Sequence, residues 1–323
     1  MTAPTTTSTL SRRRLLQGTA AALPALLGAP AFAQGAKREL RIGNQKGVLS
    51  LLKGRGTLEQ RLAPLGVKLS WTEFTAGPVQ LEALNVGSID FGDVGEAPPI
   101  FAQAAGAPLA YVAATVARPR SEAVLVPQGS AIRSVAELKG KRIALNKGSN
   151  VHYFIARLAE KNGLAYSDLQ LVYLPPADAR AAFEKGSVDA WVIWDPFLAA
   201  AEHTLGARVL ADASGVVNNR AYYFSSLNYA SRNADVISVL VEEIDKVEQW
   251  GQGNRDAYAA ELARLLGLPR PVLDLATRRT QFGASAITRA ILAEQQQVAD
   301  TFLALKLIPR KINVLDAAAA GIA

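Results

Sequence analysis

The chain has 323 residues, half of them apolar and 20% charged, and its formal net charge is +7. A chain of this length and composition can bury one large core or two moderate ones. It contains no cysteine, which excludes disulfides, thiolate metal sites, cysteine nucleophiles and a lipid-modified N-terminal cysteine. Its basic residues are scattered and are not interleaved with aromatic residues, so nucleic-acid binding has little support.

The first 33 residues have the pattern of an export signal. The arginines 12–14 precede an apolar segment at 18–27, and Ala31-Phe32-Ala33 supplies a small-x-small cleavage pattern. This segment is too short to span a bilayer comfortably. Removal of the signal takes away three arginines and no acids, which lowers the net charge from +7 to +4. We therefore predict a soluble periplasmic protein, cleaved after Ala33 and exported by the twin-arginine or the general route.

From Glu39 onward, apolar runs alternate with helical patterns, which predicts a mostly parallel sheet covered by helices. The first strands are expected at 40–44, 68–73, 89–94 and 109–117. A second set is expected at 122–126, 142–145, 169–173, 190–194 and 208–210, followed by one more strand at 222–227. Long amphipathic helices are then expected at 235–250, 256–266, 271–279 and 285–305.

Two crossovers are expected to divide these elements into two lobes. Arg118-Pro119-Arg120 reads as the first crossover, since proline removes a backbone donor and stiffens the chain. The second is expected near Asn218 to Tyr222. On this prediction, lobe one comprises residues 34–120 and 220–323, and lobe two comprises residues 121–219.

An internal repeat indicates that the two lobes are alike. The stretch Ala83 to Glu96 (ALNVGSIDFGDVGE) is echoed 99 positions later by Ala182 to Asp195 (AFEKGSVDAWVIWD). In both copies a Gly-Ser pair ends a helix, an aspartate opens a strand, and the strand stops at an acidic residue next to proline-containing sequence. The fold hypothesis is two α/β lobes with a ligand cleft between them.

The ligand is expected beyond the carboxyl ends of the strands, where helix N-termini present unpaired N–H groups and the positive end of the helix dipole. Such a cleft suits a small oxyanion. The segment from Lys147 to His152 is the strongest candidate, because its glycine allows close backbone approach and Ser149, Asn150 and His152 offer further donors. The alternative is that Ser149 only caps a helix and that His152 lies at the surface.

Acidic and aromatic residues near the expected cleft have two interpretations each. Glu96 and Asp195 either contact the ligand or only favour a helix N-terminus, and nothing else supports paired-carboxylate catalysis. Trp194 either lies beside an organic tail or packs in the core. Of Tyr222 and Tyr223, one is expected to face the cleft and the other the core, since successive strand residues point to opposite faces.

Six segments together resemble the aliphatic-sulfonate-binding proteins of ABC importers and, more loosely, proteins that bind taurine, nitrate or thiamine precursors. They are residues 44–47 (NQKG), 81–90 (LEALNVGSID), 97–106 (APPIFAQAAG), 147–152 (KGSNVH), 176–183 (PADARAAF) and 188–196 (VDAWVIWDP). The resemblance implies an α/β periplasmic type II binding fold whose two lobes close on a ligand. It also implies a monomer without a cofactor, and a membrane permease and its ATPase as partners.

The sulfonate site that the resemblance implies comprises Gln45, Gly95, Glu96, Ser149, Asn150, His152, Trp194 and Asp195, with Asn219 and Tyr222 as further members near the crossover. Some relatives have aspartate in place of Glu96 and serine in place of Asn150. Both differences bear on the preferred tail more than on the anionic head.

Three other functions remain open at this point. The first is a binding protein for another small anion or amine, such as taurine, nitrate, a sulfate ester or a thiamine precursor. A periplasmic enzyme has little support, because the chain has two histidines far apart, no cysteine, no G-x-G-x-x-G and no nucleophile elbow. A receptor that feeds a signalling partner binds its solute in the same way as an importer component, and the sequence does not separate the two.

Overall fold

The computed structural model of the protein describes residues 1–2 and 38–319. The predicted export signal and its cleavage site lie outside these residues, apart from the first two positions. Lys37–Ala323 is one unit, and it carries two β-sheets. Among the described residues, no helix combines the length and the apolar character needed to cross a membrane.

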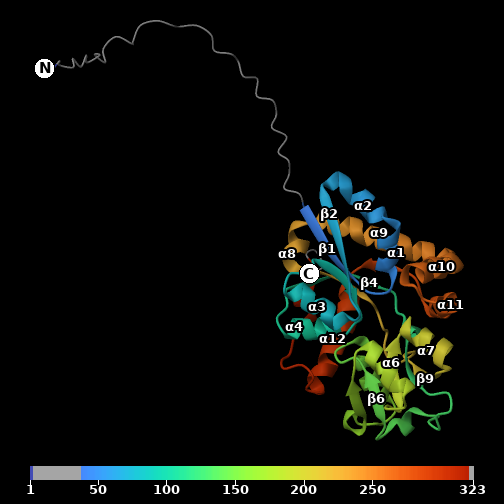
Figure 1. Ribbon diagram of the computed structural model, residues 1–323. Coiled ribbons are helices and arrows are strands. Elements are labelled where there is room, and N and C mark those ends of the chain that lie inside the picture. Colours follow the sequence, from blue (N-terminus) through green and yellow to red (C-terminus); the bar gives the residue numbers. More distant parts are fainter. Residues whose placement is uncertain (3–37, 320–323) are drawn as a thin grey trace. The chain divides into compact units, whose positions relative to one another are not determined.

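The first sheet has six strands in the order β11-β4-β10-β3-β1-β2, and the second has five in the order β7-β6-β8-β5-β9 (Figure 1). The first comprises β1 (Arg38–Asn44), β2 (Val67–Glu73), β3 (Phe91–Val94), β4 (Leu109–Thr115), β10 (Tyr222–Ser226) and β11 (Ala284–Ala286). The second comprises β5 (Glu122–Val126), β6 (Arg142–Leu145), β7 (Gln170–Tyr173), β8 (Ala190–Trp194) and β9 (Arg208–Asp212).

The two sheets share one topology over five strands. In the first, β2, β1 and β3 run parallel, and β10 lies antiparallel between β3 and β4. In the second, β7, β6 and β8 run parallel, and β5 lies antiparallel between β8 and β9. Four of these five strands in each sheet run in one direction, as the prediction of a mostly parallel sheet requires, and the fifth is the antiparallel exception. The antiparallel strands β5 and β10 each follow a chain crossing from the other sheet, and such a strand carries no local sequence mark of its direction.

Twelve α-helices are found in the described residues. Seven precede the last strands: α1 (Val48–Arg55), α2 (Thr57–Leu62), α3 (Gly77–Asn85), α4 (Pro98–Ala104), α5 (Asn150–Lys161), α6 (Pro176–Glu184) and α7 (Phe197–Leu205). The others are α8 (Leu227–Arg232), α9 (Ala234–Gly253), α10 (Arg255–Leu266), α11 (Arg270–Arg279) and α12 (Arg289–Ala304). Three of the four predicted C-terminal helices are confirmed with small shifts at their ends.

The fourth predicted helix, 285–305, begins later than expected. Ala284–Ala286 forms β11, which pairs antiparallel with β4 at the edge of the first sheet. The Thr288 side chain then accepts a hydrogen bond from the Ile291 N–H, so α12 begins at Arg289. Alanine and serine have no strong strand preference, and pairing with a distant strand decides the structure here.

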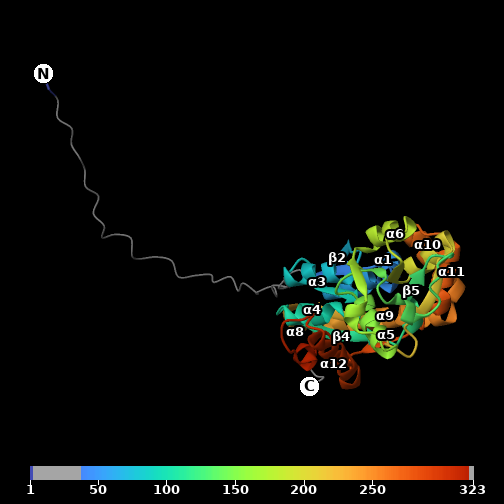
Figure 2. The same ribbon diagram turned by 90° about the horizontal axis from the view of Figure 1, so that it is seen from below.

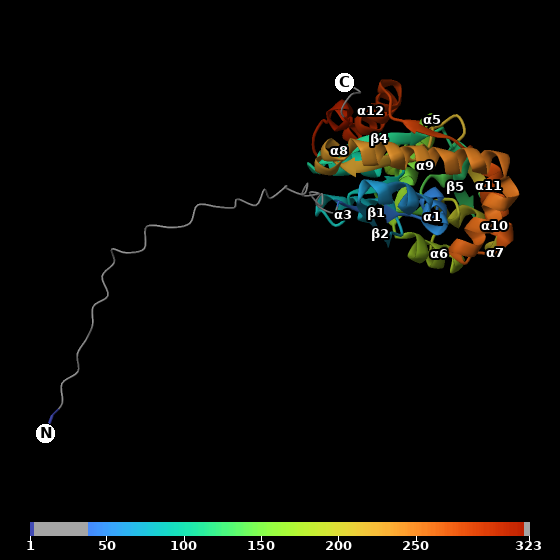
Figure 3. The same cartoon turned by 90° about the horizontal axis from the view of Figure 1, so that it is seen from above.

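The helices cover both sheets and join them through one apolar core. Figures 1 and 3 show α9 beside α1, and Figures 1 and 2 show α12 beside α4. Phe101 of α4 packs on Phe302 of α12 with ring centroids 4.9 Å apart. One cluster of buried apolar side chains contains Phe302, Tyr222 of the first sheet and Val124 of the second sheet.

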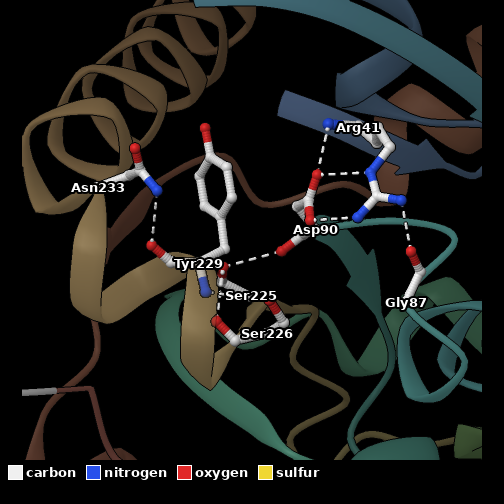
Figure 4. Close-up of polar contacts among 7 residues, drawn as sticks. All are labelled: Arg41, Gly87, Asp90, Ser225, Ser226, Tyr229 and Asn233. Carbon is white, nitrogen blue, oxygen red and sulfur yellow. Dashed lines mark hydrogen bonds and ion pairs between the residues drawn. The ribbon is translucent and has the colours of Figure 1, made fainter. Parts of the chain in front are cut away.

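The turn at the centre of the repeat is held by an arginine on the first strand. Gly87, which follows α3, has a φ of 71°, a left-handed conformation that favours glycine. The Arg41 guanidinium contacts the Asp90 carboxylate, with Nη2 2.7 Å from Oδ1, and donates to the Gly87 carbonyl oxygen (Figure 4). Behind this turn, the Ser225 hydroxyl donates to the Asp90 carbonyl oxygen at 2.8 Å.

The second copy has the same arrangement. Gly186, after α6, has a φ of 67°. Arg142 Nη2 lies 3.3 Å from Asp189 Oδ1 and 3.3 Å from the Gly186 carbonyl oxygen that accepts its hydrogen bond. The centre of the repeat is therefore a structural turn in both sheets.

Candidate ligand-binding site

A cavity of about 440 Å³ lies between the two sheets. The loops after β1, β2 and β3 form one wall, the loops after β6, β7 and β8 form the other, and both chain crossings border it. Seven predicted site residues line it: Gln45, Gly95, Ser149, Asn150, Trp194, Asp195 and Asn219. The other three predicted site residues, Glu96, His152 and Tyr222, are not among its lining residues.

Six helices begin at this cavity: α1, α3, α4, α5, α6 and α7. None of their N-cap residues accepts a hydrogen bond through its side chain. Of the other six helices, α8 and α12 are capped by Ser226 and Thr288, whereas α2, α9, α10 and α11 also lack a side-chain cap. At the start of α7, the Asp195 side chain accepts from the Ala199 N–H. The other five helix N-termini present positive dipole ends and N–H groups, so the cavity is suited to an oxyanion.

Gln45 and Asp93 form a polar floor at the end of the first sheet. The Gln45 side-chain amide donates to the Asp93 carbonyl oxygen at 2.8 Å, and the Gln45 N–H donates to Asp93 Oδ1 at 3.3 Å. Burial raises the pKa of Asp93 to about 6, although these and other hydrogen bonds favour its ionised form. The Gln45 amide nitrogen is thus used within the protein.

Three basic residues also line the cavity, and the candidate site deduced from sequence omitted them all. Arg118 Nη2 lies 2.6 Å from Glu248 Oε2 on α9, and only 17% of its side chain is exposed. Arg220 Nε lies 2.7 Å from Glu294 Oε2 on α12. Lys46 follows β1. The signal for both arginines was their place in the predicted crossovers, because chain crossings between two lobes border the cleft.

Ser149 and Asn150 lie at the start of α5, but their side chains are directed to the protein. The Ser149 hydroxyl donates to the Asn146 carbonyl oxygen at 2.8 Å. Asn150 Nδ2 donates to Glu122 Oε2 at 2.6 Å and to Asn219 Oδ1 at 3.1 Å. Both amide hydrogens of Asn150 are therefore used, and what α5 offers to a ligand is backbone N–H groups. The expectation that the Asn150 side chain adds donors is wrong for this reason.

Gly95 brings the two walls into contact. A Cβ atom placed on this glycine would lie 2.8 Å from Asn150 Cβ and 3.0 Å from Asn150 Cγ. Real Cβ atoms do not approach other carbons this closely, so only glycine allows the loop after β3 to meet the start of α5 in this arrangement.

Aromatic side chains supply an apolar wall. Trp194 and Phe197 line the cavity with their rings edge to face, 6.0 Å between centroids and 87° between planes. Tyr223 and Phe74 line it from the first sheet. Tyr222 points to the other face of β10, where its ring packs edge to face on Tyr111. The predicted site residue Tyr222 therefore lies in the core, and its neighbour takes the position at the cavity.

Comparison with known proteins places this geometry in a family. Residues 65–250 match the family model described as NMT1/THI5 like. An Escherichia coli protein named as an aliphatic sulfonates-binding protein is 41% identical over 299 residues, which cover 91% of this chain and 93% of that protein. The chain belongs to the NMT1/THI5-like family.

Solved structures of similar proteins agree with this NMT1/THI5-like assignment. The alkanesulfonate-binding protein SsuA from Xanthomonas axonopodis pv. citri, bound to MOPS, has 42% identity and a TM-score of 0.82 over 87% of this chain and 97% of that one. The periplasmic aliphatic sulphonate binding protein SsuA from Escherichia coli has 40% identity and a TM-score of 0.80 over 88% and 92%. The predicted family and the predicted periplasmic-binding-protein fold are confirmed.

In this NMT1/THI5-like protein, Asp195 is turned toward a buried arginine. Its carboxylate accepts from Arg279 Nε at 3.1 Å and from the Ala199 N–H at 3.0 Å. Both side chains of the pair are 9% exposed, and Arg279 also contacts Glu202. Burial raises the pKa of Asp195 to about 6, while the Arg279 charge opposes the shift. Asp195 therefore supports the start of α7, and its carboxylate is not free to receive a ligand.

Glu96 lies behind the cavity, buried beside the second chain crossing. Burial raises the pKa of this carboxyl to about 8, although the backbone N–H groups of Arg220 and Asn219 donate to it. Glu122, at the start of β5, has no exposed surface, and burial followed by the Glu96 charge raises its pKa well above the usual range. Sequence reasoning missed Glu122, because an acid that opens a strand looks like a surface residue.

His152 is a buried structural residue, neither a donor to the cavity nor a surface residue. Its Nδ1 accepts from the Gly148 N–H at 3.1 Å, and its Nε2 lies 2.5 Å from the Tyr166 hydroxyl. Its ring stacks on Phe101 of the first sheet's α4. Burial and the nearby Lys147 charge lower its pKa to about 4. Among the described residues, no group of three or more His, Cys, Asp or Glu side chains is placed to hold a metal ion.

Proposed function

We propose that this protein binds small organic sulfonates in the cavity between its sheets and delivers them to the permease of an ABC importer. The observation that carries the proposal is full-length similarity, at 40–42% identity, to proteins named as sulfonate-binding, one of them solved with the sulfonate MOPS bound. The cavity supports it independently, because six helices begin there and basic residues border it.

The sulfonate group is proposed to lie at the uncapped N-termini of α3 and α5. The backbone N–H groups at Gly77 and Asn150 begin these helices and line opposite walls of the cavity. Arg118 adds a positive charge that Glu248 largely balances, which limits the energy needed to desolvate the site. Such a site attracts an anion. It can also release the anion without breaking a buried ion pair between the ligand and the protein.

The organic part is proposed to lie against Trp194 and Phe197. These rings present apolar surface on the second-sheet wall, opposite Tyr223 and Phe74. A cavity of about 440 Å³ accommodates a sulfonate with a tail of several carbon atoms. Aromatic walls select for apolar contact area and not for one tail shape, so several alkanesulfonates are expected to bind.

Closure of two lobes completes the proposal. Lobe one, residues 34–120 and 220–323, and lobe two, residues 121–219, are proposed to rotate about the two crossings, as in other proteins that close around ligands. The contact between Gly95 and Asn150 then belongs to the closed state. We further propose that residues 1–33 direct export to the periplasm, with cleavage after Ala33, and that the binding protein is a monomer.

A transport role is favoured over catalysis. The full-length relatives are named as binding proteins. Neither acid at the ends of the repeat is available as a catalytic group: Asp195 is paired with Arg279, and Glu96 is not among the residues that line the cavity.

Isothermal titration calorimetry on the mature protein tests the proposal. The ligands are ethanesulfonate, longer alkanesulfonates, taurine, sulfate and nitrate, and the buffers contain no sulfonate. A sulfonate is expected to bind with a Kd below about 100 μM, equivalent to about −5.5 kcal/mol. Binding of nitrate or an amine with no sulfonate below that limit contradicts the proposal.

A further inference from the structure

Four polar side chains form a buried cluster where the two sheets meet behind the cavity. Glu96 comes from the loop after β3, Glu122 from β5, Asn150 from α5 and Asn219 from the second crossing. All four are at least 92% buried. Asn150 Nδ2 donates to both Glu122 and Asn219, at 2.6 and 3.1 Å. Because Asn150 also contacts Gly95 and begins α5, the cluster fixes part of the cavity wall.

Glu96 and Glu122 have too few hydrogen-bond donors to be stable as two ionised carboxylates. Among the described residues, Oε1 of each is buried without a hydrogen-bond partner. Glu122 receives one donor, from Asn150, and the negative charge of Glu96 further disfavours its ionised form. Glu96 accepts from the backbone N–H groups of Arg220 and Asn219, and Asn150 links the Asn219 side chain to Glu122. Burial disfavours the ionised form of each carboxyl, and the Glu96 charge adds to the cost of ionising Glu122, whereas one added proton removes this repulsion.

The remaining charged and titratable groups around this pair do not supply the missing positive charge. Arg220 faces Glu96, but its guanidinium is paired with Glu294 of α12, whose own charge opposes ionisation of Glu96. Tyr222 of β10 and Tyr153 of α5 also face Glu96, and both are neutral phenols at pH values near 7 because burial raises their pKa.

We propose that Glu96 and Glu122 are a proton-sharing pair that positions Asn150, so that closing the lobes on a ligand takes up one proton. The inference rests on the proposed function, since it requires a ligand that closes the lobes. Separating Gly95 from Asn150 lets water reach the space between the glutamates, and in water both ionise at their ordinary pKa. Closure removes the water, and the pair then retains a proton.

The direction of the pH dependence follows from this linkage. The closed state binds more protons than the open state at pH values between the ordinary glutamate pKa and about 8, so ligand affinity is highest at low pH and falls as pH rises through this window. The sulfonate itself is a strong acid that stays ionised, so the change belongs to the protein.

Other buried titratable groups determine the pH at which proton uptake can be attributed to the glutamate pair alone. The pKa of His152 is lowered to about 4. Closure therefore changes its protonation only below about pH 7, where an exposed histidine is partly protonated. Asp93 and Asp195 have raised pKa values of about 6 and are ionised above that range. At pH 7.5 these three groups contribute little, and the glutamate pair is expected to take up about 0.7 proton per ligand.

Calorimetry with ethanesulfonate at pH 7.5 in Tris, imidazole and phosphate buffers measures this uptake, because the observed heat changes with the ionisation enthalpy of the buffer. For the unmodified protein we expect uptake of at least half a proton, and a Kd that rises about 25-fold between pH 6.5 and 8.5. Glu96→Gln removes the carboxyl whose pKa of about 8 sets this window, so it is expected to abolish both effects while ethanesulfonate still binds. Glu122→Gln removes the neighbouring charge but leaves Glu96 buried, so it is expected to reduce the uptake.

Glu243→Gln is the matched control, since Glu243 is also buried but pairs with Arg61 and Lys246 away from the cluster. It is expected to keep the wild-type proton uptake. Binding of ethanesulfonate with no buffer dependence in the unmodified protein overturns the inference and leaves the proposed function intact. The same uptake in the Gln variants also overturns it. Absence of binding by every sulfonate instead overturns the proposed function.

Discussion

The two ends of the repeat, Gly95-Glu96 and Trp194-Asp195, show how one structural turn can lead to two different cavity walls. After β3 the chain presents open backbone, which contacts Asn150, and its acid turns inward toward a second glutamate. After β8 it presents an indole, and its acid pairs with Arg279. The shared centre of the repeat builds the sheets, and the divergent ends serve the ligand.

The largest expected effect is on stability, and it distinguishes Asp195, which is paired with an arginine, from Glu96, which lies near a second glutamate. Arg279→Met leaves the buried Asp195 and the half-buried Glu202 without their cation, so we expect a loss of about 3 kcal/mol in the free energy of unfolding. Glu96→Gln removes a carboxyl that burial already disfavours and is expected to change it by less than about 1 kcal/mol. Urea unfolding measures both.

The exposed pair Arg180–Glu184 provides the control for this comparison. Its side chains are 38% and 40% exposed, so Arg180→Met is expected to cost less than about 0.5 kcal/mol. A loss for Glu96→Gln as large as that for Arg279→Met would show that both acids depend on ion pairs, and the contrast would fail.

The second expected effect concerns the backbone at Gly95, which contacts Asn150 across the cavity. Gly95→Ala places a methyl group 2.8 Å from Asn150 Cβ and should hinder closure, weakening ethanesulfonate binding about thirtyfold, or about 2 kcal/mol. Gly129→Ala is the control, since an added Cβ there meets no atom within 4 Å. Calorimetry checks both, and unchanged affinity for Gly95→Ala would mean that ligand binding does not need this contact.

The third effect concerns the aromatic wall. Trp194→Ala should weaken hexanesulfonate binding about tenfold, because the longer tail loses apolar contact, and should change ethanesulfonate binding about threefold or less. Trp250→Ala, which removes an indole packed on Arg55, is expected to alter neither affinity. Equal losses for both ligands would place the indole at the sulfonate group instead of the tail.

The smallest effect is expected at the turn in the centre of the repeat, which contains Asp90 in one copy and Asp189 in the other. Asp90→Asn weakens a contact whose carboxylate is 11% exposed, and we expect a loss of about 1 kcal/mol in the free energy of unfolding. At Asp189 the carboxylate is 34% exposed and the arginine 47%, so Asp189→Asn should cost about 0.5 kcal/mol. Urea unfolding checks the order, and a reversed order would contradict the burial argument.

Local patterns predicted the strands well, because the chemistry that forms them is local. The apolar runs before and after residue 118 became β1 to β9, and the repeat correctly indicated two alike sheets. Strand direction was not predictable for β5 and β10, since it depends on where the chain arrives from. The helix expected from Ser285 lost its first residues to pairing with β4, a contact between distant segments.

For the site, the sequence predicted positions better than side-chain directions. Gln45, Ser149 and Trp194 do line the cavity, because a loop that follows a strand must lie at that edge of the sheet. The orientations of Asn150 and Asp195 depend on Glu122 and Arg279, which are 28 and 84 positions away. No periodicity within the chain encodes such partners.

A crystal structure of the mature protein with ethanesulfonate tests the central claim most directly. We expect the sulfonate oxygens within hydrogen-bond distance of backbone N–H groups at the starts of α3 and α5, the ethyl group against Trp194, and Gly95 still in contact with Asn150. A sulfonate bound outside this cavity, or inside it with the N-termini of α3 and α5 left without contact to its oxygens, would contradict the account.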